Sequence, residues 1–588
     1  MTRVHNDPEQ FKDDMLTGFT SAYARYVQKV PKASGVMRTG GARRGKVSVI
    51  IGGGCGHYPA FSGLVGPGLA DGSVVGDIFT SPSTEQAYRV ARALDGGAGV
   101  LFSFGNYAGD VMNFGVAQER LRADGVACAT VLVTDDLASA TADASTNRRG
   151  IAGTLVVFKV AGAAAARGDE LAEVERVARK ANARTRTLGV AFAGCTFPGQ
   201  SEPLFEVPAG SMEVGLGIHG EPGIRTVEKS SAHDLAVTLV EPLLAERPAD
   251  ASGRVAVLLN GLGATKYEEL FVLWKDILPM LEGAGVEVVL PEVGEFVTSL
   301  DMAGCSLTVT WLDEELEELW CAPVDTPAFR RGEVSSLPQY EACGLPEAAL
   351  AAVDGPAREF SAESGRAAGT VRAVLAKMLA VVIEHEGELG RIDAVAGDGD
   401  HGTGMTRGLR AATDGAEAKG GAGSVLRAAG RAWADKAGGT SGVLWGLFLE
   451  SIGDVLGDEA TPTAPGVVDA LQQGLDAMRR IGKAEVGDKT MLDALTPFID
   501  TLRAAVDAGQ ALPQAWAQAA STATRAAGDT AQLRPRVGRA RPLAERSVGT
   551  PDAGAISFAL CAEAAGEVLT EAPGPESTAA ESTVDEFR

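Results

Sequence analysis

Residues 392–405, IDAVAGDGDHGTGM, place three carboxylates, Asp393, Asp398 and Asp400, within eight positions and surround the last two with glycines. Mg²⁺ in proteins is usually held by a few carboxylates together with substrate phosphates. Glycines allow backbone N–H groups to come close to phosphate oxygens. The stretch therefore predicts a loop that binds a magnesium–nucleotide complex, and hence a phosphotransferase. A glycine-rich turn with solvated aspartates is the alternative.

The same loop partly matches three other motifs, and none of them fits. An EF-hand needs further ligands and a glycine at positions where this chain has Gly402, Thr403 and Leu409. A dinucleotide-binding fold needs a strand just before its glycines. Residues 371–390 lack the alternation of a strand and predict a helix instead. The P-loop pattern is absent, because residues 487–490, GDKT, lack its Gly-Lys pair.

The rest of the chain divides into regions of different pattern. Residues 367–570 are rich in Ala, Leu, Arg and Glu at helical spacing and predict an all-α domain. Residues 1–330 alternate strand-like and helix-like segments, which predicts an α/β domain with two sub-domains divided near residues 180–190. Residues 331–366 predict a linker. The polar residues 571–588 predict a disordered tail.

Several strand-like segments of the α/β region are continuous apolar runs, as expected for strands covered on both faces. The predicted strands are residues 46–51, 99–104, 129–133, 190–193, 254–259, 286–290 and 307–311. The predicted helices between them are residues 84–93, 150–181 and 232–245.

Composition excludes several classes of protein. A length of 588 residues predicts more than one domain. The net charge of −24 argues against nucleic acid as a partner, since nucleic-acid binding needs clustered Lys and Arg. The first residues contain no apolar segment and no apolar run reaches about 18 residues, so we expect neither secretion nor a membrane span. The seven cysteines form no C-x-x-C pair, which fits a reducing cytoplasm.

The histidines are a second functional signal. Imidazole acts as a nucleophile and as an acid–base group near neutral pH, and loops at strand ends are where α/β folds build sites. Three of the six histidines lie beside glycine in glycine-rich loops and are predicted to be functional: His57, His219 and His401. The other three are predicted to be surface residues: His5, His233 and His385.

Further glycine-rich clusters fit a phosphoryl-transfer site. Residues 438–442, GGTSG, offer backbone donors and hydroxyls, and they can equally begin a helix. Residues 487–495 supply Lys489 and an apolar face for a base, and residues 549–555 form a similar loop. In the first region, Asp110 follows a predicted strand and is either an acid–base group or a helix cap.

Together and in this order, these pieces resemble the fused, ATP-dependent dihydroxyacetone kinases over residues 10–565. The motifs of the first part are GGGCGHYPAF, DIFTSPS, NYAGDVMNF, RRGIAGT, GIHGEPG, NGLGAT and TSLDMAG. Those of the second part are GDGDHGTGM, GGTSG, GDKTMLDAL and PDAGA.

The resemblance implies that the first domain binds a small ketose covalently. A histidine nitrogen adds to the carbonyl and forms a hemiaminal, and His219 matches that histidine. His57 and Asp110 match residues that handle protons, with Asp110 as the general base for the attacking hydroxyl. The matched substrate-binding residues are Gly54, Cys55, Gly56, His57, Asp110 and His219.

The resemblance implies that the second domain is a helical barrel that binds ATP and two Mg²⁺ ions, which neutralise phosphate charge during transfer. Asp393, Asp398 and Asp400 match the metal ligands. The helical domain has no acid for the sugar hydroxyl, so the two domains must meet, and in the family they do so across a homodimer. The matched nucleotide contacts are His401, Gly402, Thr403, Gly404, Thr440, Ser441, Gly482, Met491, Asp552, Ala553 and Gly554.

Three positions depart from the family pattern. Tyr58 stands where the family usually has glutamate, Gly105 where it usually has lysine, and Pro542 where it usually has tyrosine. Exchanging lysine for glycine frees space and removes a charge. The departures at Tyr58 and Gly105 put dihydroxyacetone in doubt as the substrate, and we interpret the roomier pocket as favouring the four-carbon ketose erythrulose.

Four other functions remain open. Dihydroxyacetone itself is the alternative substrate. A ketone-sensing coregulator without activity would be expected to lack Asp110 or the aspartate trio, and all are present. A phosphoenolpyruvate-dependent kinase is disfavoured because both domains are fused and no phosphocarrier domain is appended. Cleavage of FAD by the second domain is a further activity found among family members.

Overall fold

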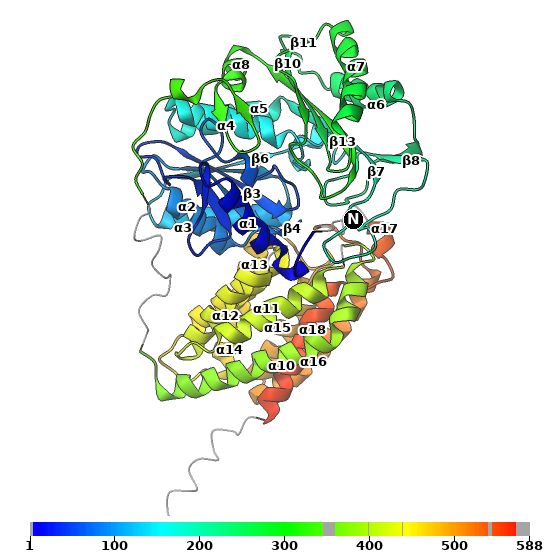
Figure 1. The fold of residues 1–588 in the computed structure, drawn as a ribbon. Helices are drawn as coiled ribbons and strands as arrows, with labels where there is room; N and C mark the ends of the chain where they lie inside the picture. The colour runs from blue at the N-terminus through cyan, green and yellow to red at the C-terminus, as the bar shows by residue number, and fades with distance from the viewer. Residues whose placement is uncertain (1–3, 345–358, 398, 438, 539–543, 572–588) are drawn as a thin grey trace, which may run out of the picture. The chain divides into compact units, whose positions relative to one another are not determined.

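The computed structural model describes residues 4–344, 359–397, 399–437, 439–538 and 544–571 (Figure 1). The chain forms two compact units, an α/β unit, Met1–Ala352, and a helical unit, which apart from residues 438–440 comprises Val353–Arg588. Of the predicted tail, 571–588, all residues but Glu571 lie outside the described residues.

The first sheet of the α/β unit has parallel central strands and an antiparallel edge. Helices α2 (Thr84–Leu94) and α3 (Ala108–Ala123) cover one face, and α4 (Thr154–Arg167) and α5 (Leu171–Ala183) cover the other. The strands β4, β3, β5 and β6 are parallel, so their carboxyl ends share one edge. In sheet order the strands are β1 (Val27–Lys29), β2 (Gly35–Arg38), β4 (Gly72–Ile78), β3 (Ser48–Cys55), β5 (Val100–Gly105) and β6 (Cys128–Val133).

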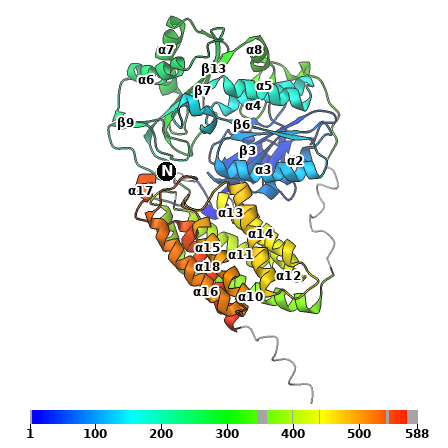
Figure 2. The ribbon, with the colours of Figure 1, turned by 180° about the vertical axis from the view of Figure 1, so that it is seen from behind.

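The second sheet is mainly antiparallel. Helices α6 (Ala232–Ala245) and α7 (Tyr267–Gly283) pack on its outer face. Ala191, Ala256 and Leu258 on its inner face join the core of α4 and α5, so both sheets share one hydrophobic core. Figure 2 shows α4 and α5 lying next to β6 of the first sheet. Its strands, in order, are β11 (Glu287–Val288), β10 (Arg254–Gly261), β13 (Ala303–Leu312), β7 (Thr185–Ala193), β8 (Ser211–Val214) and β9 (Arg225–Glu228), with β12 (Glu292–Gly294) paired to β10.

Short elements complete the α/β unit. They are α1 (Phe11–Ala22), α8 (Glu314–Cys321), the strand pair β14 (Val324–Asp325) and β15 (Arg330–Arg331), and the 3₁₀ turns η1 (Pro8–Gln10), η2 (Ser62–Leu64), η3 (Ala142–Asn147) and η4 (Val334–Ser336). Tyr340 donates a hydrogen bond to the carbonyl of Ala166 at 3.4 Å. The first part of the predicted linker is therefore packed against the α/β unit.

The predicted strands correspond to β3, β5, β6, β7, β10, β11 and β13, and the helix predicted at 232–245 is α6. The single helix predicted over 150–181 is wrong. It is two helices, α4 and α5, because Gly168 ends α4 in the left-handed region at φ 104°. Strand β4 was not predicted from the sequence. Gly72 at its start and Gly76 within it interrupt the alternation expected of a strand.

In the described residues the helical unit contains helices and no strand, as predicted. Trp433 and Trp445 stack at 4.9 Å in its core. Helix α10 includes the predicted helix 371–390 and starts inside the predicted linker. The helices are α10 (Ala362–Asp393), α11 (His401–Gly415), α12 (Ala422–Ala437), α13 (Gly439–Leu456), α14 (Ala464–Gly482), α15 (Leu492–Asp507), α16 (Leu512–Asp529), α17 (Ala544–Ser547) and α18 (Ala553–Glu571).

Among the described residues, α18 alone is long and apolar enough to cross a membrane by length and composition. More than half of its apolar window is buried inside the helical unit, where Phe558 packs against Phe498 and Trp445. The core helix of a folded bundle has the same composition, so α18 is accounted for by its packing.

Candidate active site

His57, Asp110 and His219 line one cavity of the α/β unit. His57 follows β3, Asp110 lies in the first turn of α3 after β5, and His219 lies in the loop between β8 and β9. The carboxyl edge of the parallel strands thus faces a loop of the second sheet, a place where α/β folds bind ligands. The other lining residues are Gly52, Gly53, Gly54, Phe61, Gly105, Tyr107, Gly150, Ile151, Thr154, Ile218 and Val297.

The glycines of the 52–56 stretch are needed for close packing. A Cβ on Gly54 would lie 2.8 Å from the backbone of Phe79, and a Cβ on Gly56 would lie 2.8 Å from its ring. Phe79 itself has φ 54°, an unusual conformation for a bulky residue. Its ring stacks on that of His57, with centroids 4.8 Å apart and planes at 15°. Phe79 therefore supports His57, a role that the sequence did not reveal.

His57 is buried and hydrogen-bonded at both ring nitrogens. Its Nδ1 lies 2.7 Å from the carbonyl oxygen of Thr298, and its Nε2 lies 3.0 Å from Nε2 of His219. Burial, together with the positive charge of His219, lowers the pKa of His57 to about 3. His57 is therefore neutral at physiological pH.

His219 is oriented by a carboxylate two residues further along the chain. Nδ1 of His219 lies 3.1 Å from Oε1 of Glu221, and the backbone N–H of His219 donates to Oε2 at 3.0 Å. Arg149 lies 3.7 Å from Glu221 and donates to Asp136 at 2.9 Å. Burial raises the pKa of Glu221, but His219 and Arg149 outweigh it and hold the pKa well below its usual range. Tyr107 packs edge-on against His219 with ring centroids 4.6 Å apart.

The loop that carries Arg149 is fixed by a buried carboxylate. Asp135 accepts hydrogen bonds from the backbone N–H groups of Ile151 and Gly153, both at 2.8 Å. Gly150 lies against the end of β5, because a Cβ on Gly150 would approach the Cα of Gly105 to 2.6 Å. The RRGIAGT motif thus forms one wall of the cavity and also orients Glu221 through Arg149.

Gly105 does not enlarge the cavity in the way expected from the sequence. A Cβ at this position would meet the ring of Tyr107 at 2.9 Å and the carbonyl of Gly150 at 3.0 Å. The space freed by the missing lysine is filled by these two neighbours. The remaining effect of glycine in place of lysine at position 105 is that the cavity wall carries one positive charge fewer.

Two other expected contacts do not line the cavity. Cys55 and Gly56 are not among its lining residues. Burial raises the pKa of the Cys55 thiol to about 12, and Asp77 and Lys12 lie near it. Tyr58 packs against Phe19 at 5.9 Å, on the side of α1. The Tyr58 departure from the family pattern therefore does not alter the cavity. Pro542 lies outside the described residues.

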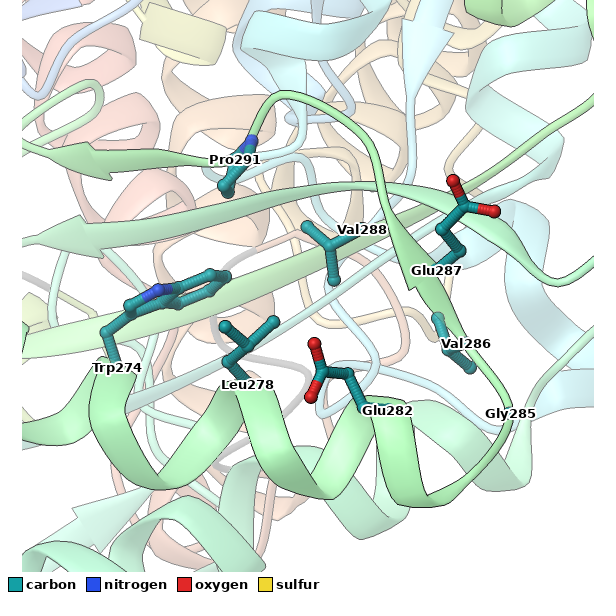
Figure 3. Close-up of a pocket in the computed structure, with 8 residues that line it drawn as sticks. All are labelled: Trp274, Leu278, Glu282, Gly285, Val286, Glu287, Val288 and Pro291. Carbon is teal, nitrogen blue, oxygen red and sulfur yellow. The ribbon is translucent and has the colours of Figure 1, made fainter.

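A second hollow lies on the surface of the α/β unit between α7 and the segment that includes β11 (Figure 3). Trp274, Leu278 and Glu282 extend from α7 toward the facing segment, whereas the carboxylate of Glu287 points away from the helix. It holds no histidine and no residue singled out from the sequence. It therefore offers no group that could trap a carbonyl.

In the helical unit, the predicted nucleotide contacts gather at helix ends. His401, Gly402, Thr403 and Gly404 begin α11, Thr440 and Ser441 begin α13, Met491 precedes α15, and Asp552, Ala553 and Gly554 begin α18; Gly482 ends α14. The ends of α11, α15 and α18 meet. His401 Nε2 lies 2.9 Å from Ser557 Oγ, and a Cβ on Gly554 would lie 3.5 Å from Met491. Helix N-termini offer free N–H groups to phosphate oxygens.

Carboxylates are concentrated at these helix ends. Asp393 ends α10 and accepts a hydrogen bond from the N–H of Gly399 at 2.8 Å. Burial raises the pKa of Asp552 to about 7, and the negative charges of Asp493 and Asp393 add to the shift. Burial also raises the pKa of Asp400. Mutual repulsion among buried carboxylates is what a divalent cation relieves.

Asp398 lies outside the described residues, and the described residues alone contain no group of three His, Cys, Asp or Glu side chains that could hold a metal. The aspartate trio as a metal site therefore stays a prediction. The oxygen donors of Asp393 and Asp400 nevertheless fit Mg²⁺ in kind.

Two residues of this region have structural explanations. A Cβ on Gly402 would lie 2.1 Å from the carbonyl of Glu386, so Gly402 allows α11 to touch α10. Lys489 donates to the carbonyls of Ser547, Thr550 and Leu533 at 2.7, 2.8 and 3.2 Å. Lys489 therefore ties loops together, and its ammonium is used by backbone oxygens instead of phosphate.

The comparisons with known proteins cover both units. The Dak1 domain model matches residues 17–328 and the DAK2 domain model matches residues 395–567. The chain is 54% identical over 575 residues to the D-erythrulose kinase of Mycolicibacterium smegmatis, covering 97% of this chain and 99% of that protein. It is 52% identical to the L-erythrulose kinase of Pectobacterium atrosepticum, covering 97% of each.

Among solved structures, the chain is similar to the dihydroxyacetone kinase from C. freundii in complex with AMP-PNP and Mg²⁺. The sequence identity is 30%, the TM-score is 0.52, and the match covers 96% of this chain and 99% of that chain. The fold class predicted from the sequence is confirmed by this match and by both domain models. The chain belongs to the dihydroxyacetone kinase family and carries its Dak1 and DAK2 domains in one polypeptide.

Proposed function

We propose that this protein is an ATP-dependent erythrulose kinase that holds its ketose as a hemiaminal on His219. The cavity that contains His57, Asp110 and His219 supports this proposal, because it joins a nucleophile, a proton carrier and a base in one place. Both relatives described above act, by name, on erythrulose, with opposite handedness and nearly equal identity.

The residues divide the reaction between them. His219 adds to the carbonyl carbon and so selects ketoses over polyols, which have no electrophilic carbon. Asp110 accepts the proton of the hydroxyl that attacks the γ-phosphorus. When bound, Mg²⁺–ATP supplies the phosphoryl group with its charge neutralised. Asp393, Asp398 and Asp400 would hold two ions, and the ends of α11, α13, α15 and α18 would hold the phosphates and the nucleoside.

Steady-state kinetics with ATP and Mg²⁺ test the substrate. D-erythrulose, L-erythrulose and dihydroxyacetone are compared by kcat/KM under identical conditions. We expect one enantiomer of erythrulose to give the highest value. A higher kcat/KM for dihydroxyacetone would show that the protein is a dihydroxyacetone kinase instead, and no turnover of any ketose would point to a sensing role. A reaction that needs a phosphocarrier protein would overturn the use of free ATP.

We propose further that the protein works as a homodimer in the cytoplasm, with the helical unit of one subunit serving the α/β unit of the other. Mixing inactive His219→Ala and Asp398→Asn subunits tests this arrangement. If sites form between subunits, each mixed dimer regains one intact site, and activity returns to about a quarter of the wild-type value. If each chain completes its own site, the mixture stays inactive.

A further inference from the structure

The hydrogen bonds of the two cavity histidines determine where their protons lie. A carbonyl oxygen only accepts, so Nδ1 of His57 must donate to Thr298. Glu221 is ionised, since its pKa lies well below the usual range, so Nδ1 of His219 must donate to it. Both rings therefore carry a proton on Nδ1.

The two Nε2 atoms that remain lie 3.0 Å apart. Two bare imidazole nitrogens repel each other at this distance, whereas one proton between them makes a hydrogen bond. The pair therefore holds three protons on four nitrogens and carries one positive charge. Burial disfavours that charge on His57, while Glu221 lies beside His219, so the charge belongs to His219.

The charged and titratable groups around the pair agree with this assignment. Glu221 contacts His219 directly and Arg149 lies behind Glu221. Asp136 holds Arg149 in turn, and Tyr107 packs on the ring of His219. Asp110 faces the same cavity. The carboxylate of Glu221 is the negative group that contacts the imidazolium.

We propose that Glu221, braced by Arg149, is a positioning residue that selects the Nε2 nitrogen of His219 for attack and keeps one proton between His219 and His57 for delivery to the ketose oxygen. The inference rests on the proposed hemiaminal, in which His57 already carries a proton, and adds to it the group that orients the nucleophile, Glu221.

The step balances in atoms and charge. The shared proton passes from Nε2 of His219 to Nε2 of His57, which frees the lone pair on His219. A bond forms between Nε2 of His219 and the carbonyl carbon, and the C=O π electrons move to oxygen. His57 then gives its Nε2 proton to that oxygen. The product is a hydroxyl and an alkylated His219 imidazolium, still paired with Glu221, so no proton enters or leaves the site.

The cavity encloses about 20 Å³ in this structure, room for about one water molecule. A ketose must therefore separate the two rings as it enters, and the hydrogen bond between the Nε2 atoms breaks at that point. The carbonyl group takes the place between the nitrogens where the shared proton was held.

Glu221→Gln tests the inference, with Glu213→Gln as the matched control. Glu213 lies on β8, in the strand before the same loop, and hydrogen-bonds Thr226. Adduct formation with erythrulose is followed by rapid mixing and native mass spectrometry of the full-length protein without nucleotide, across a range of pH. Glu221→Asp is the conservative variant, since it keeps the negative charge but moves the carboxylate away from His219 by the length of one methylene group.

We expect Glu221→Gln to slow adduct formation roughly 10- to 100-fold, by analogy with the carboxylates that orient metal-binding histidines. Removing the negative group that contacts the imidazolium weakens the hold on the shared proton, so the alkaline limb of the rate should move to lower pH. Glu221→Asp should keep the alkaline limb of the pH profile at the wild-type position and lower only the rate of adduct formation. Glu213→Gln should match the wild type.

An unchanged rate and pH profile in Glu221→Gln would overturn the inference while the proposed function stands. Absence of an adduct in the wild-type protein would overturn the proposed function itself. If Glu221→Gln does not fold, ¹⁵N-histidine NMR of the wild-type protein decides the question. The inference requires protonated Nδ1 on both rings, and a bare Nδ1 on either ring contradicts it.

Discussion

The predicted sites of the two units are built from different kinds of groups. In the α/β unit, His219 is fixed by a chain of side chains that runs through Glu221 and Arg149 to Asp136, with each link at 2.8 to 3.7 Å. In the helical unit, the predicted contacts are helix ends and repelling carboxylates. Forming a covalent bond requires one nitrogen in one tautomer, whereas holding a metal and phosphates requires charge and free N–H groups.

Because the two predicted sites use different groups, we expect substitutions to impair the ketose site and the nucleotide site separately. His219→Ala should give the largest effect, because it removes the nitrogen proposed to add to the carbonyl carbon, and the other cavity imidazole, His57, is held by Thr298 through its Nδ1. We expect kcat/KM for erythrulose to fall by about 10³-fold or more, as for loss of a nucleophile. His233→Ala is the control, since His233 is exposed on α6. Activity within tenfold of wild type in His219→Ala would contradict covalent trapping.

Loss of a carboxylate in the helical unit should abolish turnover and spare the ketose adduct. Asp400→Asn removes a predicted oxygen ligand of Mg²⁺, and we expect kcat to fall by about 10²-fold or more. Calorimetric titration with erythrulose should give the wild-type affinity. Asp414→Asn, on the exposed side of α11, is the control. If Asp400→Asn also loses ketose binding, the division of labour between the units is wrong.

Two glycines of α11, two residues apart, provide a matched comparison of stability within the helical unit. Gly402→Ala forces a methyl group against the carbonyl of Glu386 at 2.1 Å, whereas nothing lies within 4 Å of a Cβ on Gly404. We expect Gly402→Ala to lower the free energy of unfolding of this unit by about 1–3 kcal/mol, and Gly404→Ala to leave it unchanged or raise it slightly. Equal melting temperatures for the two variants would show that α10 and α11 do not touch there.

The smallest effect should come from the wall of the cavity. Asp135→Asn keeps the shape of the side chain but weakens the hydrogen bonds to Ile151 and Gly153. We expect the α/β unit to lose about 1–2 kcal/mol of stability, with the helical unit unaffected. Thermal unfolding of the variant measures this, and Asp143→Asn, which is exposed, serves as control. A loss confined to the helical unit would contradict the assignment of Asp135.

Sequence patterns predicted the fold class and four residues that line the cavity, Gly54, His57, Asp110 and His219. Apolar runs located most of the long strands, and the glycine-flanked histidines pointed to His57 and His219. The supporting residues were missed, although Glu221, Arg149 and Phe79 lie in the quoted motifs. The role of Glu221 could have been predicted from the sequence, since a carboxylate two residues from a loop histidine can accept a hydrogen bond from its ring. The roles of Arg149 and Phe79 could not have been predicted. These residues follow β6 and β4, and only the folded chain brings the ends of these strands beside the second sheet.

The substrate expectation illustrates the limit of reasoning from single exchanges. The exchange of lysine for Gly105 suggested a larger pocket, and the relatives described above are named for erythrulose. The structure nevertheless fills the space beside Gly105 with Tyr107 and Gly150. The stated reason is therefore wrong even though the relatives agree with the substrate, and packing around a missing side chain could not be predicted without coordinates.

The most direct measurement of the central claim is native mass spectrometry of the protein with erythrulose and no nucleotide. The account predicts a mass increase equal to the intact ketose, with no water lost, that maps to the peptide containing His219 and is absent in His219→Ala. Turnover of erythrulose by a wild-type protein that never shows this increase would contradict it.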